Sequence, residues 1–177
     1  MIKIMMKLKF NFMNRLIVLF IVTPLIIISC DKEKDDNNID EIVFSGITMR
    51  DNVGNTLSQD TNDWQLHDNW TDKENSLFFE KMNGICSTED YDYYIISYPN
   101  PCSGMFFLHL SKPNYSRLAF RIVDKDFNIL LSRDSITSTC IAINIGEFNV
   151  SNEIVRIYYK FFGQNCELKG HGDIKIE

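Results

Sequence analysis

The feature that most limits what this chain can fold into is a series of short β-rich runs that begins at Tyr91 and continues to the C-terminus. In one run, Leu118, Phe120 and Ile122 occupy alternate positions, which predicts a strand with one buried face. Turn residues separate the runs, and no long helical period intervenes. The pattern predicts an all-β fold, an antiparallel β-sandwich of the Ig-like or Greek-key type. The runs cover residues 91–98, 105–111, 117–123, 128–132, 140–145, 153–162 and 172–177.

Composition supports a packed domain. Of the 177 residues, 45% are hydrophobic and 12% aromatic, so one domain or a small pair can bury a core. Residues 42–49 form a further β-rich run, and a turn follows at 51–55. We therefore expect residues 42–97 to form an N-terminal strand and helix region that packs on a sandwich at 98–177.

One short helix is expected, over residues 72–82. Thr71 and Glu74 have the spacing of a capping box, in which each side chain binds the backbone amide of the other residue. Asn83-Gly84 is a typical helix stop. Leu77, Phe78 and Met82 would share the buried face of this helix.

The first 29 residues have the pattern of a secretory signal. Their four cations all lie within the first fifteen residues, and an apolar run of thirteen residues, 16–28, follows. Because a membrane-spanning helix needs roughly 20 apolar residues, this run is too short to cross a bilayer. The next segment, 31–41, has Ile39 as its one apolar residue, so it is expected to be a solvated tether.

Ile27-Ile28-Ser29-Cys30 resembles the lipobox of bacterial lipoproteins. The resemblance implies that the Cys30 thiol receives a diacylglycerol, that the signal is cut between Ser29 and Cys30, and that the new amino group is acylated, for example with palmitate. Two or three chains anchor stably, at about 0.8 kcal/mol per buried methylene. The alternatives are an ordinary cleaved signal with an accidental cysteine, or an uncleaved anchor.

Lys34, Asp35 and Asp36 resemble the Lys-acid-acid export signal of Bacteroidota-type surface lipoproteins. This resemblance implies transfer to the outer leaflet of the outer membrane, where the chain would face the medium. The alternative is a merely hydrophilic spacer.

Tyr98-Pro99-Asn100-Pro101 resembles the YPNP opening of the C-terminal β-sandwich found in type IX secretion cargo. The strands expected at 105–111, 118–132 and 154–177 follow this motif in the same order as the strands of that family. The resemblance implies a β-sandwich and, as a second role, a sorting domain. The family's middle-turn glycine is missing, and Asn128 is expected to take its left-handed conformation.

Four cysteines remain beside Cys30, which in an exported protein suggests disulfides. Three pairings are possible, and we expect Cys140–Cys166 together with Cys86–Cys102, since Cys140 and Cys166 would lie at one end of the sandwich. The alternative is free buried thiols. A zinc site is not predicted, because no two cysteines are two to four residues apart.

Two expected loops contain short motifs that resemble modification or metal-binding sites. Asp134-Ser135-Ile136 resembles the Asp-Ser/Thr-aliphatic motif for O-glycosylation in Bacteroidota, which makes Ser135 a candidate acceptor in an expected polar loop. The segment 124–128 begins like a calcium loop, but Ile129 stands where glycine is required, so it is expected to be a hairpin turn.

Catalysis finds little support in the sequence. The three histidines form no metal-binding pair and accompany no nucleophile elbow. Trp64 and Trp70 could form a sugar-stacking platform, although such residues more often seal the join between a helix and a sheet. We predict no enzyme, cofactor or metal.

Charge narrows the set of partners. The whole chain carries −6, and residues 1–29 carry +4, so the remainder carries −10. An acidic body of this kind disfavours nucleic acid.

Three functional hypotheses remain. The first is a lipid-anchored outer-membrane surface protein that binds a surface protein complex or a polysaccharide. The second is a sorting domain at 98–177 that carries a small cargo region at 42–97. The third is a carrier of a small lipid or cofactor.

Overall fold

The computed structural model describes residues 42–44, 46–66, 69–89 and 91–177. The expected signal peptide, the Ser29–Cys30 cleavage site and the tether with Lys34, Asp35 and Asp36 lie outside the described residues. Among the described residues, no helix has the length and apolar character needed to cross a bilayer.

Ten strands and one short α-helix make up the secondary structure of the described residues, together with a 3-10 turn, η2. The N-terminal elements are β1 (Met49–Arg50), β2 (Thr56–Ser58), α2 (Asp72–Ser76), β3 (Gly84–Ile85) and β4 (Tyr94–Tyr98). The remaining elements are β5 (Met105–Ser111), β6 (Arg117–Val123), β7 (Ile129–Ile136), β8 (Cys140–Asn144), η2 (Ile145–Glu147), β9 (Ile154–Phe162) and β10 (Cys166–Lys175).

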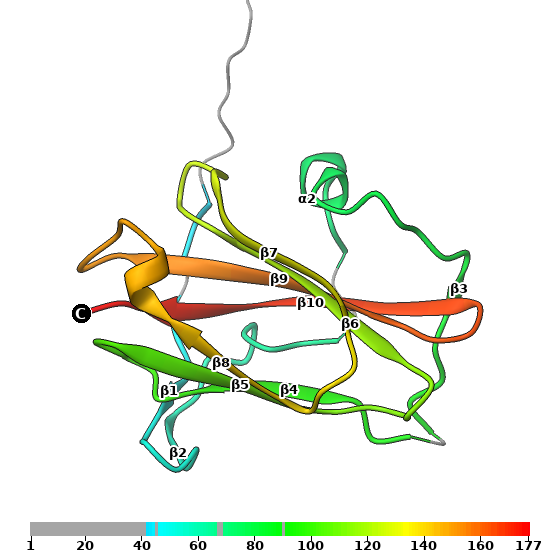
Figure 1. Ribbon diagram of the computed structural model, residues 1–177, viewed down its shortest axis with the longest axis horizontal. Helices are drawn as coiled ribbons and strands as arrows, with labels where there is room; N and C mark the ends of the chain where they lie inside the picture. Colours follow the sequence, from blue (N-terminus) through cyan, green and yellow to red (C-terminus); the bar gives the residue numbers. More distant parts are fainter. Residues whose placement is uncertain (1–41, 45, 67–68, 90) are drawn as a thin grey trace, which may run out of the picture. The chain divides into compact units, whose positions relative to one another are not determined.

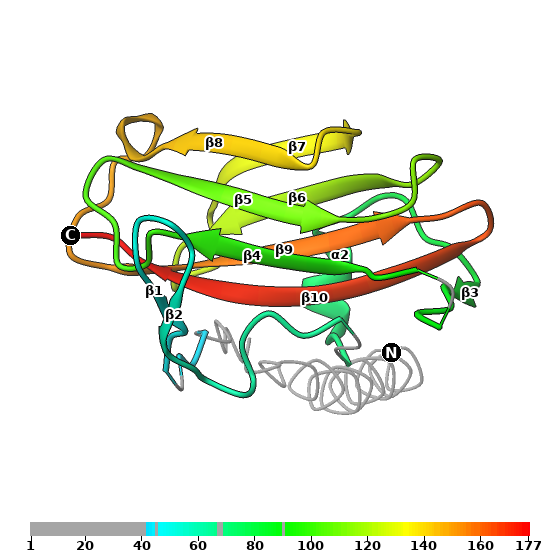
Figure 2. The ribbon, with the colours of Figure 1, turned by 90° about the horizontal axis from the view of Figure 1, so that it is seen from below.

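The strands form two facing sheets (Figures 1 and 2). One sheet has the order β3-β10-β9-β6-β7 and the other the order β4-β5-β8, while β1 and β2 form a separate hairpin. All pairings are antiparallel except the short one between β3 and β10. The prediction of an antiparallel β-sandwich with one short helix is confirmed.

The main core lies between the two sheets. Alternate residues of each strand point inward, because successive side chains of a strand face opposite sides. The inward residues are large and apolar, and many of them are fully buried: Phe106, Leu108, Leu118, Phe120, Ile122, Val155, Ile157 and Ile174.

A second apolar cluster covers the outer face of the five-stranded sheet, on the side where α2 lies (Figure 1). Trp70 and Phe78 contribute to it from the connecting segment and pack against Ala119 and Tyr158 of the sheet. β6 is therefore buried on both faces, with Arg121 only 6% exposed. The expectation of a half-buried strand at 117–123 was wrong, because the 70–82 segment folds back over the face that would otherwise meet water.

The helix is shorter than predicted. The capping box is confirmed: the Glu74 amide donates to the Thr71 hydroxyl, and the Thr71 amide donates to the Glu74 carboxylate. However, α2 ends at Ser76 rather than at residue 82. Tertiary contacts explain the early end, because the Leu77 carbonyl accepts a hydrogen bond from Arg121 and Phe78 is buried against the sheet.

Some element boundaries also differ from the sequence expectations. The run at 42–49 contributes only Met49–Arg50 to a strand, and β4 lies in the sandwich although it begins four residues before the expected boundary at 98. The 124–128 segment is a hairpin turn, as predicted. Phe127 rather than Asn128 has the positive φ, 63°, and the Asn128 side chain donates a hydrogen bond to Asp124.

The disulfide joins Cys86 to Cys166, so the expected Cys140–Cys166 and Cys86–Cys102 pairing was wrong. The parallel pairing of β3 with β10 brings the two Cα atoms within 4.9 Å. Cys140 begins β8 in the other sheet and is exposed, while Cys102 is buried beside Lys175 at the far end of β10. The cysteine pairing depends on which sheet each strand belongs to. Counting the strands along the sequence does not reveal this.

Candidate functional site

The outer face of the three-stranded sheet is the candidate site, and we call it the aromatic face. Its strand register places Tyr98 beside Phe107 and Phe107 beside Ala142, with Ile96, His109 and Cys140 in the neighbouring row. Intervening residues such as Ile95, Phe106 and Ile143 are buried, so the face residues point outward. Figure 2 shows the three strands side by side. The face comprises Tyr94, Ile96, Tyr98, Met105, Phe107, His109, Ser111, Cys140, Ala142 and Asn144.

The aromatic rings of this face touch one another. The ring centroids of Tyr98 and Phe107 are 5.8 Å apart, and His109 lies 5.9 Å from Tyr94 and 6.4 Å from Tyr98. These separations are typical of favourable aromatic pairs. Met105, at one end of the face, is 47% exposed. The result is one continuous aromatic row across two strands.

The face has a distinct composition and a defined border. None of its ten residues is Asp, Glu, Lys or Arg, although 24% of the chain is charged. The β1–β2 hairpin borders it at Tyr98: a Cβ added to Gly54 would lie 3.4 Å from the Tyr98 ring. Gly54 also has a φ of 90°, which residues with a Cβ atom rarely adopt. The backbone conformation and the close approach therefore both favour glycine here.

The two tryptophans singled out in the sequence lie elsewhere. Trp70 is 9% exposed and stacks on Phe78, with Tyr158 against its edge. Trp64 is stacked on Tyr159, with ring centroids 6.0 Å apart, and lies over Gly172 so closely that a Cβ there would clash. Both tryptophans pack on the sheet, which matches the packing alternative rather than a free stacking platform.

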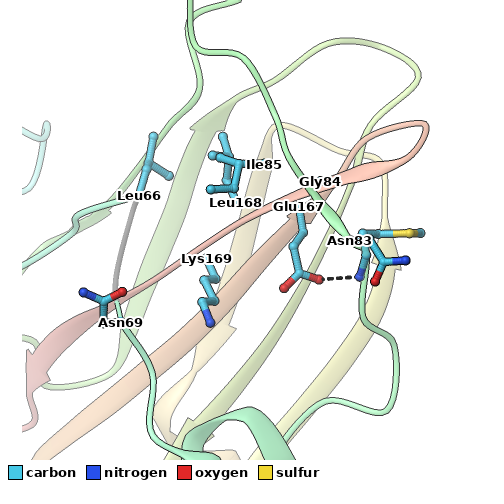
Figure 3. A pocket seen from close by; sticks show the side chains of 9 residues that line it. Leu66, Asn69, Asn83, Gly84, Ile85, Glu167, Leu168 and Lys169 are labelled. Carbon is cyan, nitrogen blue, oxygen red and sulfur yellow. Dashed lines mark hydrogen bonds between the residues drawn. The ribbon is translucent and has the colours of Figure 1, made fainter.

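A pocket of about 310 Å³ lies beside β10, between Leu66, Asn69 and the 82–85 segment (Figure 3). Its volume is at the low end for ligand sites. Its charged groups are already engaged: Glu167 accepts hydrogen bonds from the Met82 amide and from Lys160, and Lys169 donates to Asn75. A ligand in this pocket would compete with these contacts, so we rank it below the aromatic face.

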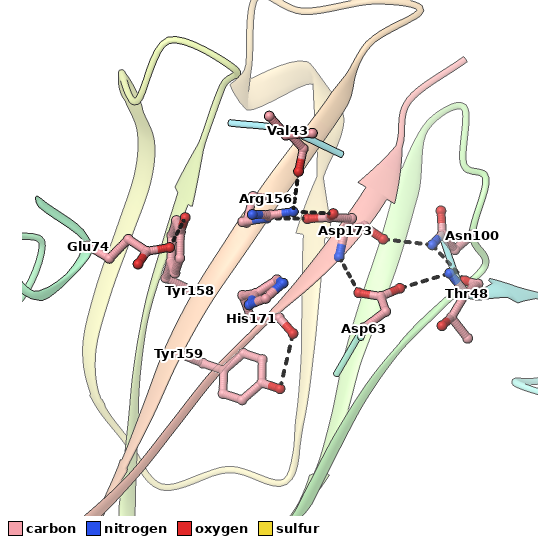
Figure 4. Close-up of polar contacts among 10 residues, drawn as sticks. All are labelled: Val43, Thr48, Asp63, Glu74, Asn100, Arg156, Tyr158, Tyr159, His171 and Asp173. Carbon is pink, nitrogen blue, oxygen red and sulfur yellow. Dashed lines mark hydrogen bonds and ion pairs between the residues drawn. The ribbon is translucent and has the colours of Figure 1, made fainter. Parts of the chain in front are cut away.

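A buried polar cluster holds the 43–64 segment against β10 (Figure 4). The Asp63 carboxylate accepts hydrogen bonds from the amides of Thr48 and Asp173, at 2.8 and 2.7 Å. Asp173 in turn forms a two-point ion pair with Arg156, at 2.7 and 2.8 Å. Burial raises the pKa of Asp63 to about 6, since removal from water disfavours the charged form more than the two hydrogen bonds favour it. All these groups have structural partners, so the cluster serves the fold.

Ser135 is not in a loop, contrary to expectation. It lies near the end of β7, exposed, with a φ of 57°. The strand extends this far because Ile136 still pairs with Leu118, across a register shift that accommodates the unusual backbone. The neighbouring Asp134 forms an ion pair with Arg121. Among the described residues, no group of three or more His, Cys, Asp or Glu side chains could hold a metal ion.

Sequence reasoning missed the aromatic face. The alternation of Tyr94, Ile96 and Tyr98 with buried residues, repeated in 105–111, was a usable signal. What the sequence could not supply was the pairing of these two strands, which places their aromatic residues on one surface.

The fold and this face define the class of the chain: an antiparallel β-sandwich with an aromatic sheet surface that lacks Asp, Glu, Lys and Arg. No family model and no curated protein matches the chain. One solved structure similar to it is a DUF3244 family protein with an immunoglobulin-like β-sandwich fold from Bacteroides vulgatus. The two share 16% identity over 49% of this chain and 88% of the other, with a TM-score of 0.34.

Proposed function

We propose that this chain is a lipid-anchored, non-enzymatic binding module on the outer surface of a bacterial outer membrane. The anchor follows from the lipobox-like sequence that ends at Cys30, and surface display from Lys34, Asp35 and Asp36. Residues 31–41 act as the tether. A flexible tether of this length has a root-mean-square reach of about 20 Å, which leaves the sandwich free to meet partners near the membrane.

The single observation that supports binding is where the tether joins the sandwich. The Ile42 amide donates to the Lys125 carbonyl, and the Ile42 side chain packs with the cluster on the outer face of the five-stranded sheet. Arg156 and Phe44 make contact on the same side. Ile42, the first described residue after the proposed tether, therefore lies on the opposite side of the sandwich from the aromatic face, and that face stays available to a partner.

The alternative of a sorting domain with a small cargo is less well supported. Residues 42–97 supply β3 and β4 to the two sheets, and Val43, Thr48 and Asp63 are hydrogen-bonded to β9, Asn100 and β10 respectively. The buried apolar residues described in this region belong to clusters shared with the sheets, so they do not form a separate core that could act as cargo. A mature chain that still ends at Glu177 would exclude sorting by a cleaved tail.

Metabolic labelling with palmitate tests the anchor. We expect the wild-type chain to be labelled and Cys30→Ala to be unlabelled, while Cys140→Ala, which removes an exposed cysteine, stays labelled. Equal labelling of wild type and Cys30→Ala would refute the anchor.

Protease treatment of whole cells tests surface display. The wild-type chain should be digested, and a variant with Lys34, Asp35 and Asp36 replaced by alanine should be protected. Protection of the wild type, in cells whose known surface proteins are digested, would contradict display.

A further inference from the structure

We propose that the aromatic face binds an uncharged polysaccharide, with sugar rings stacked on Tyr98 and Phe107; this inference rests on the proposed binding function and names its ligand. The row of contacting rings supplies the apolar surface. Tyr94, His109, Tyr98 and Phe107 are all partly exposed and lie in mutual contact. The largest contiguous apolar patch on a folded domain is often functional.

The chemistry of the face suits sugars. A pyranose ring has an apolar face of C–H groups that can lie on an aromatic ring, and hydroxyl groups at its edge. Tyrosine hydroxyls, imidazole, serine hydroxyl and amide groups can all form hydrogen bonds with such hydroxyls. The face provides these groups at Tyr94, Tyr98, His109, Ser111 and Asn144.

Charge selects the kind of polysaccharide. The chain outside residues 1–29 carries −10, yet the ten face residues include no Asp, Glu, Lys or Arg. An anionic polymer would meet no lysine or arginine on the face, and the net negative charge of the chain would repel it. A cationic partner would find no carboxylate there. An uncharged chain is therefore the partner that the face matches.

The size of the face disfavours a second copy or another folded protein. Its longest strand, β5, has seven residues, and at about 3.3 Å per residue it spans about 23 Å. With three strands spaced about 4.8 Å apart, the face covers on the order of 300 Å², whereas a stable protein interface needs about 800 Å² on each partner. A narrow linear polymer can use the whole of such a strip.

Binding of full-length chain to three neutral polysaccharides tests the proposal. The chain, held in phosphatidylcholine vesicles, is incubated with soluble β-glucan, mannan or starch, and with polygalacturonate as the acidic counterpart. We expect at least one neutral polymer to bind and polygalacturonate not to bind. Loss of the two central rings in Tyr98→Ala/Phe107→Ala should weaken binding about tenfold or more. Tyr98→Phe, which keeps the ring, should stay within about threefold of wild type.

Ala142→Glu distinguishes loss of binding at the face from loss of binding through misfolding. Ala142 is exposed and lies beside Phe107, so the variant adds charge and bulk to the face without removing a core contact. It should abolish binding while the urea unfolding midpoint stays close to that of wild type. Tyr115→Ala removes an exposed ring that is not on the face, and should bind like wild type.

Three outcomes would overturn the proposal. They are failure of all three neutral polymers to bind, binding that Ala142→Glu leaves unchanged, and self-association that Ala142→Glu abolishes, which would make a second copy the occupant. The broader binding function has its own readout. If Ala142→Glu abolishes crosslinking to a surface protein on whole cells, the module binds through this face and only the ligand class is wrong.

Discussion

At the scale of single residues, two buried polar side chains fasten the N-terminal segment to the last strand. Asn100 is fully buried and bonds to the Thr48 carbonyl, the Asp173 carbonyl and the Lys175 amide, at 2.8, 2.9 and 3.0 Å. Asp63 bonds to two backbone amides on the same two stretches of chain. Buried polar groups of this kind stabilise the fold mainly by avoiding unsatisfied partners.

Asn100→Ala should lower the free energy of unfolding by about 2–4 kcal/mol, because it leaves two carbonyls and one amide without partners. Urea unfolding followed by tryptophan fluorescence measures the change. Asn52→Ala, in the exposed turn after β1, is the matched control and should change stability by less than about 0.5 kcal/mol. Equal stability of Asn100→Ala and wild type would show that the three hydrogen bonds contribute nothing net.

Asp63 should make stability depend on pH in an unusual direction. Its pKa is raised from 3.8 to about 6, so the folded chain holds this proton more tightly than the unfolded chain. Protonated Asp63 makes its full contribution to the free energy of unfolding below about pH 4. This contribution is lost as the pH rises through 6. The shift corresponds to about 2–3 kcal/mol.

Comparison with Asp63→Asn isolates this effect from the other carboxyl groups. The advantage of wild type over the variant in free energy of unfolding should shrink by about 2–3 kcal/mol between pH 4 and pH 7. Asp126→Asn, in an exposed turn, controls for the loss of one carboxylate. An advantage that stays constant or grows over this range would contradict the raised pKa.

At the scale of elements, long-range contacts override local signals. The capping box at Thr71 and Glu74 begins α2 as the sequence predicts, but burial of Phe78 ends it after five residues. β3 has only two residues, yet it is held to β10 by pairing and by the Cys86–Cys166 disulfide. In both cases, contact with a strand that is distant in the sequence determines where the local element ends or how it is held.

Replacement of both Cys86 and Cys166 by serine should lower the free energy of unfolding by about 4 kcal/mol. The disulfide closes a loop with a sequence separation of 80 residues, and the unfolded chain gains that much conformational freedom when it is opened. Thermal or urea unfolding under oxidising conditions measures the loss.

Cys140→Ser is the control for this variant, because Cys140 is exposed and unpaired. It should leave stability unchanged within about 0.5 kcal/mol. Peptide mapping should recover Cys86 linked to Cys166. Recovery of a Cys140–Cys166 peptide instead would contradict the strand pairing at this end of the sandwich.

At the scale of the whole molecule, the all-β sandwich could be predicted because alternation and turn residues are local properties of the sequence. The double burial of β6 and the aromatic face could not, because each depends on which strands become neighbours. Arg121 lies on an outer face that is covered by the folded-back 70–82 segment, whose Leu77 carbonyl accepts its hydrogen bond. Likewise, Tyr98 and Phe107 meet only through the β4–β5 register.

We propose that an acidic sandwich is attached to a membrane on one side and is open to a ligand on the other. Intact-mass spectrometry of the chain purified from its own membrane fraction tests this placement most directly. The account predicts a mature chain that begins at Cys30 and carries a diacylglycerol and an amide-linked acyl chain. A chain that retains Met1, or that begins at another residue without lipid, would contradict it.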